Sequence, residues 1–194
     1  VNMFKKTLVS IDLSSKTLKY EKAIPSTIGD CPASDLRPMG LGKKSNGEIF
    51  IGVVCSGESS QDVSKVRGYV LKTTDQVAST MTVVSDFNMP TIRQSKGSVP
   101  DEPLPYYIWA GFNPWKTNID DAFINSGNYS YSQPIISNID FDNYGMIIGV
   151  RDRYSDQTPA AGELAFQNAS RGDTLRACQT NNTGNYVLEN NGVC

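Results

Sequence analysis

The amino-acid sequence predicts an all-β protein, and more specifically an incomplete excerpt of a β-propeller with about four blades. Short apolar runs rich in β-branched residues recur along the 194-residue chain, separated by turn-forming residues. No window long enough for a helix has apolar residues at a 3.6-residue period. The run Gly-Glu-Ile-Phe-Ile-Gly-Val at 47–53 returns as Gly-Met-Ile-Ile-Gly-Val at 145–150. Repeated hairpins of this kind suit four-stranded blades of about 40–50 residues each, whereas a β-sandwich, the alternative, gives less reason for the repeat.

The first half of the chain predicts a succession of hairpins. Segments 7–13 and 17–23 form the first, because apolar and polar residues alternate along its second arm. A connection rich in Pro, Ser, Gly and Asp follows. Segment 35–56 then predicts a hairpin that turns at Asn46-Gly47, a dipeptide typical of tight β-turns. Two further strands are expected at 66–72 and 81–87.

The second half begins with an irregular stretch and then returns to strands. Five prolines between residues 90 and 128 break any helix or central strand, so we expect a long insertion within a single domain of residues 1–194. The remaining strands are predicted at 135–141, 146–150, 163–167, 173–178 and 186–188.

Bulk composition excludes several classes of function. A net charge of −2 and a pI near 5.2 leave no basic surface for nucleic acid. The apolar runs are too short for a membrane-spanning helix. No histidine is present, which removes Ser-His-Asp and Cys-His nucleophiles and every histidine metal site. A strand directly after Lys6 leaves no space for a leader, so we expect an excerpt of a longer secreted polypeptide.

Four cysteines permit three pairings, and their positions favour two local ones. Cys31 and Cys55 fall at the open end of one predicted hairpin, and Cys178 and Cys194 bracket a turn. Metal-type CxxC spacing is absent from the sequence. We therefore predict the disulfides Cys31–Cys55 and Cys178–Cys194 and an oxidising, extracellular location; four buried free thiols are the alternative.

Two groups of residues are candidates for ligand contact. Aromatic side chains gather in the predicted insertion at Tyr106, Tyr107, Trp109, Phe112 and Trp115. Such rings offer large, rigid contact area to a glycan or protein partner, although packing onto the neighbouring blade is favoured. Aspartates Asp140, Asp142, Asp152 and Asp156 leave paired-carboxylate hydrolysis open, with turn formation favoured.

The segment that starts at Asp140 begins like a calcium loop and then departs from it. Tyr144 and Arg151 stand where oxygen ligands are needed, which excludes an EF-hand. A looser calcium site at Asp140 and Asp142 is the only metal candidate, and we otherwise expect no cofactor and no catalytic residue.

Several motifs resemble a known family. They are Asp-Leu-Arg-Pro at 35–38, the run at 47–58, Ile-Asp-Phe-Asp at 139–142 with Met-Ile-Ile-Gly-Val-Arg-Asp-Arg at 146–153, Gly-Asp-Thr-Leu-Arg-Ala-Cys at 172–178 and Leu-Glu-Asn-Asn-Gly at 188–192. Together they resemble the propeller-like N-terminal region of very large secreted bacterial surface proteins, which often continue into B repeats of serine-aspartate-repeat adhesins. The resemblance implies a scaffold at the cell surface.

These observations lead to one expected function and two alternatives. We expect a non-catalytic extracellular module of a large bacterial surface or matrix protein, which presents loops for glycan or protein adhesion. The rest of the polypeptide or a neighbouring subunit would complete the propeller. The alternatives are a propeller-type polysaccharide hydrolase or lyase that uses aspartates, and a structural subunit of a surface filament or secretion-associated assembly.

Overall fold

The computed structural model of the chain is built almost entirely from β-strands. It describes residues 1–76, 80–91, 111–118, 123–124, 129–130, 132–153, 172–179 and 184–189. The strands are β1 (Thr7–Asp12), β2 (Thr17–Ala23), β3 (Leu36–Lys43), β4 (Glu48–Cys55), β5 (Arg67–Thr74), β6 (Thr82–Asn88), β7 (Phe123–Ile124), β8 (Tyr129–Ser130), β9 (Pro134–Phe141), β10 (Met146–Asp152), β11 (Gly172–Gln179) and β12 (Tyr186–Leu188). Three short 3-10 helices, η1 (Ala33–Asp35), η2 (Val63–Lys65) and η3 (Met89–Thr91), accompany them. The prediction of an all-β fold is confirmed.

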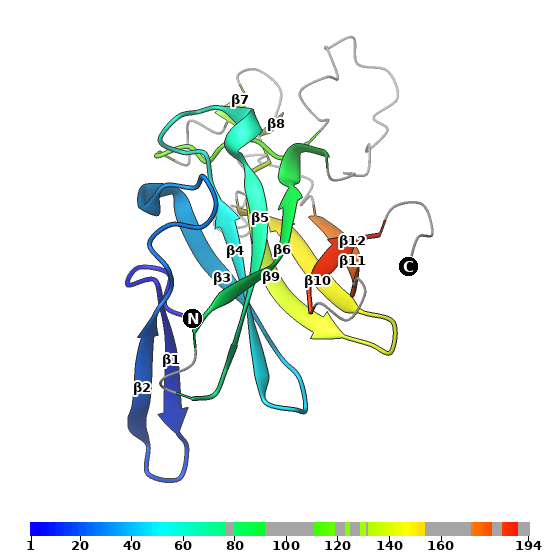
Figure 1. The fold of residues 1–194 in the computed structure, drawn as a ribbon. Coiled ribbons are helices and arrows are strands. Elements are labelled where there is room, and N and C mark those ends of the chain that lie inside the picture. The colour runs from blue at the N-terminus through cyan, green and yellow to red at the C-terminus, as the bar shows by residue number, and fades with distance from the viewer. Residues whose placement is uncertain are drawn as a thin grey trace, which may run out of the picture.

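Two four-stranded antiparallel sheets form the body of the protein (Figure 1). The first sheet has the order β3-β4-β5-β6 and the second the order β9-β10-β11-β12, so each strand pairs with its neighbours along the chain. The predicted turn at Asn46-Gly47 is present: Gly47 has a φ of +87°, and its backbone N–H donates to the carbonyl oxygen of Lys44 at 3.0 Å. Two-stranded hairpins β1-β2 and β7-β8 lie outside these sheets.

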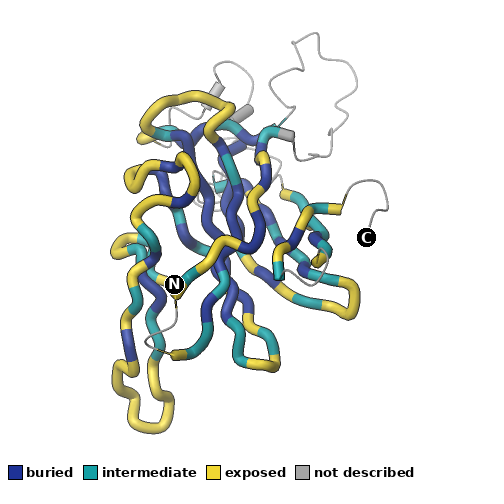
Figure 2. Tube along the Cα trace, viewed as in Figure 1, coloured by how far each residue is buried: buried dark blue, intermediate teal, exposed yellow. Residues whose placement is uncertain are grey.

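The two sheets pack against each other across a continuous apolar core. Strand β3 lies against β9, and β6 lies near β12, so equivalent strands of the two sheets are adjacent. The largest fully buried side chains of this core include Phe50 of the first sheet and Ile136, Met146 and Ile148 of the second. Figure 2 shows the burial concentrated where the sheets face each other.

Glycines on the first sheet allow the second sheet to approach closely. Gly40 and Gly52 are cross-strand partners on β3 and β4. A Cβ atom on Gly52 would stand 2.3 Å from Cγ2 of Ile136, and one on Gly42 would stand 2.5 Å from the carbonyl oxygen of Ile139. Real Cβ atoms essentially never come within 3.0 Å of another heavy atom. Strand β9 therefore packs directly on the backbone of these glycines, and a side chain at any of these positions would prevent that approach.

The opposite face of the first sheet has a core of its own. Ile51, Val53 and Leu71 pack there with Leu8 and Tyr20 of the β1-β2 hairpin. The hairpin is also held by polar contacts, since the Tyr20 hydroxyl donates to Asp75 at 2.8 Å. The described chain thus has three layers: the hairpin, the first sheet and the second sheet.

The repeated Gly-Val motif shows the direction in which the layers stack. In the first sheet, Ile51 and Val53 face back toward the β1-β2 hairpin. At the matching positions of the second sheet, Ile148 and Val150 face back toward the first sheet. Gly52 faces forward toward the second sheet. The two sheets consequently stack back to front, in the same orientation.

Some expectations differ from the structure. The sequence predicted about four blades, but within the described residues only two sheets have four strands. The other described strands form two-stranded hairpins, β1-β2 before the first sheet and the short pair β7-β8 between β6 and β9. That pair was missed in the predicted insertion. The predicted strand at 163–167 lies outside the described residues. No helix in the described part of the chain is long and apolar enough to span a membrane.

Candidate functional site

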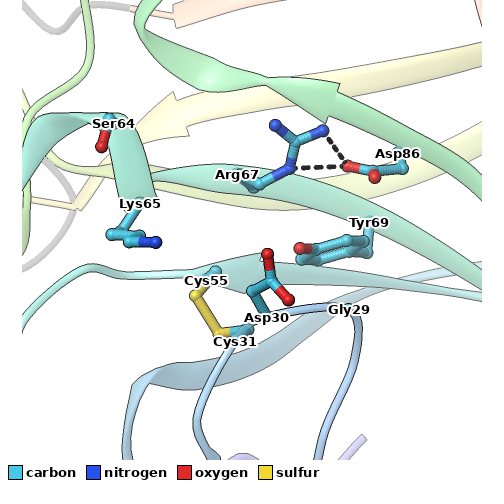
Figure 3. Close-up of a pocket in the computed structure, with 9 residues that line it drawn as sticks. All are labelled: Gly29, Asp30, Cys31, Cys55, Ser64, Lys65, Arg67, Tyr69 and Asp86. Atoms are coloured by element: carbon cyan, nitrogen blue, oxygen red, sulfur yellow. Dashed lines mark hydrogen bonds and ion pairs between the residues drawn. A yellow bond between two sulfur atoms is a disulfide. The ribbon is translucent and has the colours of Figure 1, made fainter.

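A polar pocket opens at the end of the first sheet where the predicted disulfide lies (Figure 3). Its volume is about 230 Å³. The lining residues come from the connection before β3, from η2 and from β4, β5 and β6: Gly29, Asp30, Cys31, Cys55, Ser64, Lys65, Arg67, Tyr69 and Asp86. Four of these side chains carry charge, two of each sign, so the pocket wall is neutral overall.

The Cys31–Cys55 disulfide fixes one wall of this pocket. The two Cα atoms are 5.8 Å apart, and both residues are buried. Before the bridge, the chain turns sharply at Gly29, which has a φ of +56°, and the Cys31 N–H donates to the Ile28 carbonyl oxygen at 3.0 Å. Glycine suits this left-handed conformation because it has no Cβ. The turn holds Asp30 at the rim of the pocket, and the prediction of this disulfide is confirmed.

The helix η2 forms the second wall. Asp62 caps it by accepting hydrogen bonds from the backbone N–H and the hydroxyl of Ser64, at 2.8 and 2.7 Å. These bonds, with the side-chain bond from Ser64 the largest cause, lower the pKa of Asp62 below its ordinary value. A capped turn of this kind fixes the backbone that carries Lys65.

Strands β5 and β6 supply the floor. The Arg67 guanidinium donates from Nε and Nη2 to Oδ1 of Asp86, at 2.9 and 2.5 Å. The hydrogen bond to Asp86 raises the pKa of Arg67. Burial, followed by the Asp86 charge, raises the pKa of Tyr69, so its phenol stays protonated at neutral pH. A Cβ on Gly29 would lie 3.1 Å from the Tyr69 hydroxyl, which places that hydroxyl directly beneath the turn.

The aromatic residues proposed from the sequence have different positions. Phe112 and Trp115 are buried, with exposed fractions of 0% and 3%. Tyr106, Tyr107 and Trp109 lie outside the described residues. The Trp115 indole is flanked by two guanidiniums, Arg153 at 4.3 Å and Arg37 at 5.3 Å from the ring centroid, and its Nε1 donates to the Pro134 carbonyl oxygen at 2.9 Å. This geometry suits a structural contact between the two sheets.

The carboxylates proposed from the sequence are engaged in local structure. Asp142 accepts backbone hydrogen bonds from Tyr144 and Gly145 in the β9-β10 turn, and Arg176 donates to it at 2.7 Å. The Tyr144 bond is the main cause that lowers the pKa of Asp142. Asp152 is 1% exposed and accepts from the Gln133 N–H at 2.9 Å.

Both aspartates of the proposed calcium site, Asp140 and Asp142, lie within the described residues. Asp140 accepts a hydrogen bond from the Phe141 N–H at 2.8 Å. Within the part of the chain that the structure describes, no three metal-ligating side chains gather at one point. Asp156, the fourth aspartate considered for paired-carboxylate hydrolysis, lies outside the described residues.

The second predicted disulfide is described at one end. Cys178 on β11 is disulfide-bonded, and Cys194, its predicted partner, lies outside the described residues.

One cluster was missed by sequence reasoning. The Lys44 ammonium, which follows β3, lies 4.6, 5.3 and 5.5 Å from the ring centroids of Phe141, Tyr186 and Phe50. It also donates to the Tyr186 hydroxyl at 2.6 Å. These rings come from β4, β9 and β12, so their convergence on one lysine depends on the packing of the two sheets and leaves no local signal.

Comparison with known proteins finds relatives by sequence alone. No family model matches the chain, and no solved structure matches it. Three curated proteins of Dictyostelium discoideum do. Colossin-B is 27% identical over 200 residues, which cover 100% of this chain, and Colossin-D is 33% identical over 160 residues, which cover 82% of it. Colossin-A is 30% identical over 148 residues, or 76% of the chain.

The chain is similar to the Colossins. It spans only 5% of Colossin-B, 14% of Colossin-D and 1% of Colossin-A. The resemblance to bacterial surface adhesins is wrong, because these relatives belong to a eukaryote. The similarity therefore connects the chain to a small part of much longer eukaryotic proteins.

Proposed function

We propose that the chain is a non-catalytic extracellular module of a much longer polypeptide. Its propeller-like blades form a rigid scaffold that presents loops and pockets for adhesion to a glycan or protein. The observation that carries the proposal is the back-to-front stacking of two sheets, the first of which has a disulfide at one end. Stacked sheets and a fixed pocket are features of a rigid scaffold that presents a surface.

The stacking direction favours blades over a sandwich. In a two-sheet sandwich, both sheets turn their apolar faces inward toward one shared core. In a propeller, each blade packs its back on the front of the blade before it, and strands at equal radius are neighbours. The facing of Ile51 and Ile148, with β3 beside β9 and β6 near β12, fits the second arrangement.

The disulfide supports an extracellular location. Disulfides persist in oxidising compartments and are rare in the cytosol. Cys31 and Cys55 are buried, and Cys178 is also bonded, so three of the four cysteines are described as oxidised.

The contacts of the aspartates support a module without catalysis. Asp142 is used by its own turn and by Arg176, and Asp152 holds the Gln133 backbone. The rival hydrolase or lyase needs carboxylates that are free to transfer protons. Polysaccharide turnover that is abolished by Asp142→Asn or Asp152→Asn in a folded variant would overturn the proposal.

A structure of the chain within a longer piece of its polypeptide tests the blade architecture. The expected result is a further β-sheet whose back packs on the front of the second sheet, where Gly149 lies between Asn138 and Thr174. A structure in which solvent covers this face, or in which a sheet packs there in the reverse orientation, would contradict the proposal.

A further inference from the structure

We propose that the pocket beside the Cys31–Cys55 disulfide binds one neutral sugar residue of a glycan. This inference rests on the proposed adhesive function and assigns its contact site. It places recognition at the open end of the first sheet, away from the aromatic segment that the sequence favoured.

The charges of the pocket point to a neutral ligand. Arg67 is already neutralised by Asp86 through two hydrogen bonds to a single oxygen. Lys65 and Asp30 bring one charge of each sign to the rim, and among the described residues neither forms an ion pair. A ligand with net charge would meet no excess of the opposite charge in this wall.

The hydrogen-bonding groups point to a ligand rich in hydroxyls. Lys65 provides only donors, and the Asp30 carboxylate provides only acceptors. Asp86, whose Oδ1 accepts both hydrogen bonds from Arg67, adds Oδ2 as a further acceptor. Figure 3 shows these side chains directed toward a common space from different sides. A sugar hydroxyl donates and accepts at once, so a sugar ring can satisfy such a mixed wall.

The size and rigidity of the pocket set the extent of the contact. A volume of about 230 Å³ is smaller than the ~300–1,000 Å³ of pockets for drug-sized ligands, so one ring at the end of a glycan fits better than a longer segment. The disulfide, the Gly29 turn and the capped η2 helix hold the walls before the ligand arrives. Preorganised walls reduce the entropy cost of binding.

Saturation-transfer NMR on the full chain with free glucose, galactose, mannose and N-acetylglucosamine tests the assignment. At least one of these sugars is expected to bind with millimolar affinity. Lys65→Ala and Asp30→Asn are each expected to weaken that binding at least fivefold. Lys43→Ala is the matched control, since this exposed lysine lies at the opposite end of the first sheet and is expected to leave binding unchanged.

Each other outcome overturns the assignment. Binding that survives both pocket variants places the sugar elsewhere and leaves the adhesive function standing. Absence of binding by all four sugars, or binding of glycine as a zwitterion at this pocket in their place, rejects a neutral sugar as the ligand. The proposed extracellular scaffold is tested separately by disulfide mapping, so its failure and the failure of the sugar site are distinguishable.

Discussion

Gly52 of β4 lies directly beneath Ile136 of β9, at a distance that leaves no space for a side chain. A Cβ atom at this glycine would stand 2.3 Å from Cγ2 of the isoleucine. The contact joins the two sheets at the centre of their shared core, and it explains why a glycine interrupts an otherwise apolar strand. The matching glycine of the second sheet, Gly149, faces away from this core.

Gly52→Ala is expected to destabilise the protein by about 1–3 kcal/mol, because the added methyl group overpacks the core against β9. Gly149→Ala is the matched control. Its methyl group would meet chiefly the Asn138 side chain, which can rotate away, so a cost of about 1 kcal/mol or less is expected. Urea denaturation measures both. Equal losses for the two variants would contradict the stacking direction described here.

Lys44→Met is expected to lower the free energy of unfolding by about 1–2 kcal/mol, since the variant keeps the apolar stem but loses the ammonium and its bond to Tyr186. Lys43→Met, at the neighbouring exposed position, should change it by less than about 0.5 kcal/mol. A double-mutant cycle with Tyr186→Phe isolates the contact. A coupling energy of zero would mean that the lysine contributes nothing between the sheets.

Replacement of both Cys31 and Cys55 by Ser is expected to cost about 3 kcal/mol in the chain-entropy description of a disulfide, given their sequence separation of 24. Thermal unfolding with and without a reducing agent provides the measurement. The reducing agent should lower the midpoint of the wild type more than that of the double variant. A double variant that unfolds at the same midpoint as the wild type without reducing agent would show that the bridge does not stabilise the fold.

Asp12 gives a pH dependence with a defined sign. Hydrogen bonds from Ser14, followed by those from Ser15, lower its pKa from 3.8 to about 2 in the β1-β2 turn. Its stabilising bonds are therefore fully present above pH 3.8 and are lost as the pH falls toward 2. Carboxyl NMR titration should give a midpoint near 2. The gap in thermal midpoint between wild type and Asp12→Ala should close over the same range, and a midpoint near 3.8 would contradict the turn geometry.

The strands themselves were largely predictable from the sequence. Strands β2 and β12 match their predicted ranges, and most others differ from theirs by one or two residues at an end. The hairpin at Asn46-Gly47 was predicted because its signal is local: a turn dipeptide between two apolar runs. The Cys31–Cys55 pairing followed from the same hairpin, which brings the open ends of its two arms together.

The candidate site was not predictable in the same way. Arg67, Asp86 and Lys65 are ordinary surface residues in the sequence, and only the pairing of β5 with β6 and the position of η2 bring them beside Asp30. The burial of Trp115 between Arg37 and Arg153 likewise depends on contacts between distant segments. Periodicity states which residues share a face of a strand, but it does not state which sheet covers that face.

Disulfide mapping of the native protein, separated into cell and medium fractions without reduction, tests the central claim most directly. The extracellular scaffold predicts that the protein is recovered outside the cytosol and that mass spectrometry finds the Cys31 and Cys55 peptides cross-linked to each other. Recovery in the cytosol with both cysteines as free thiols would contradict it.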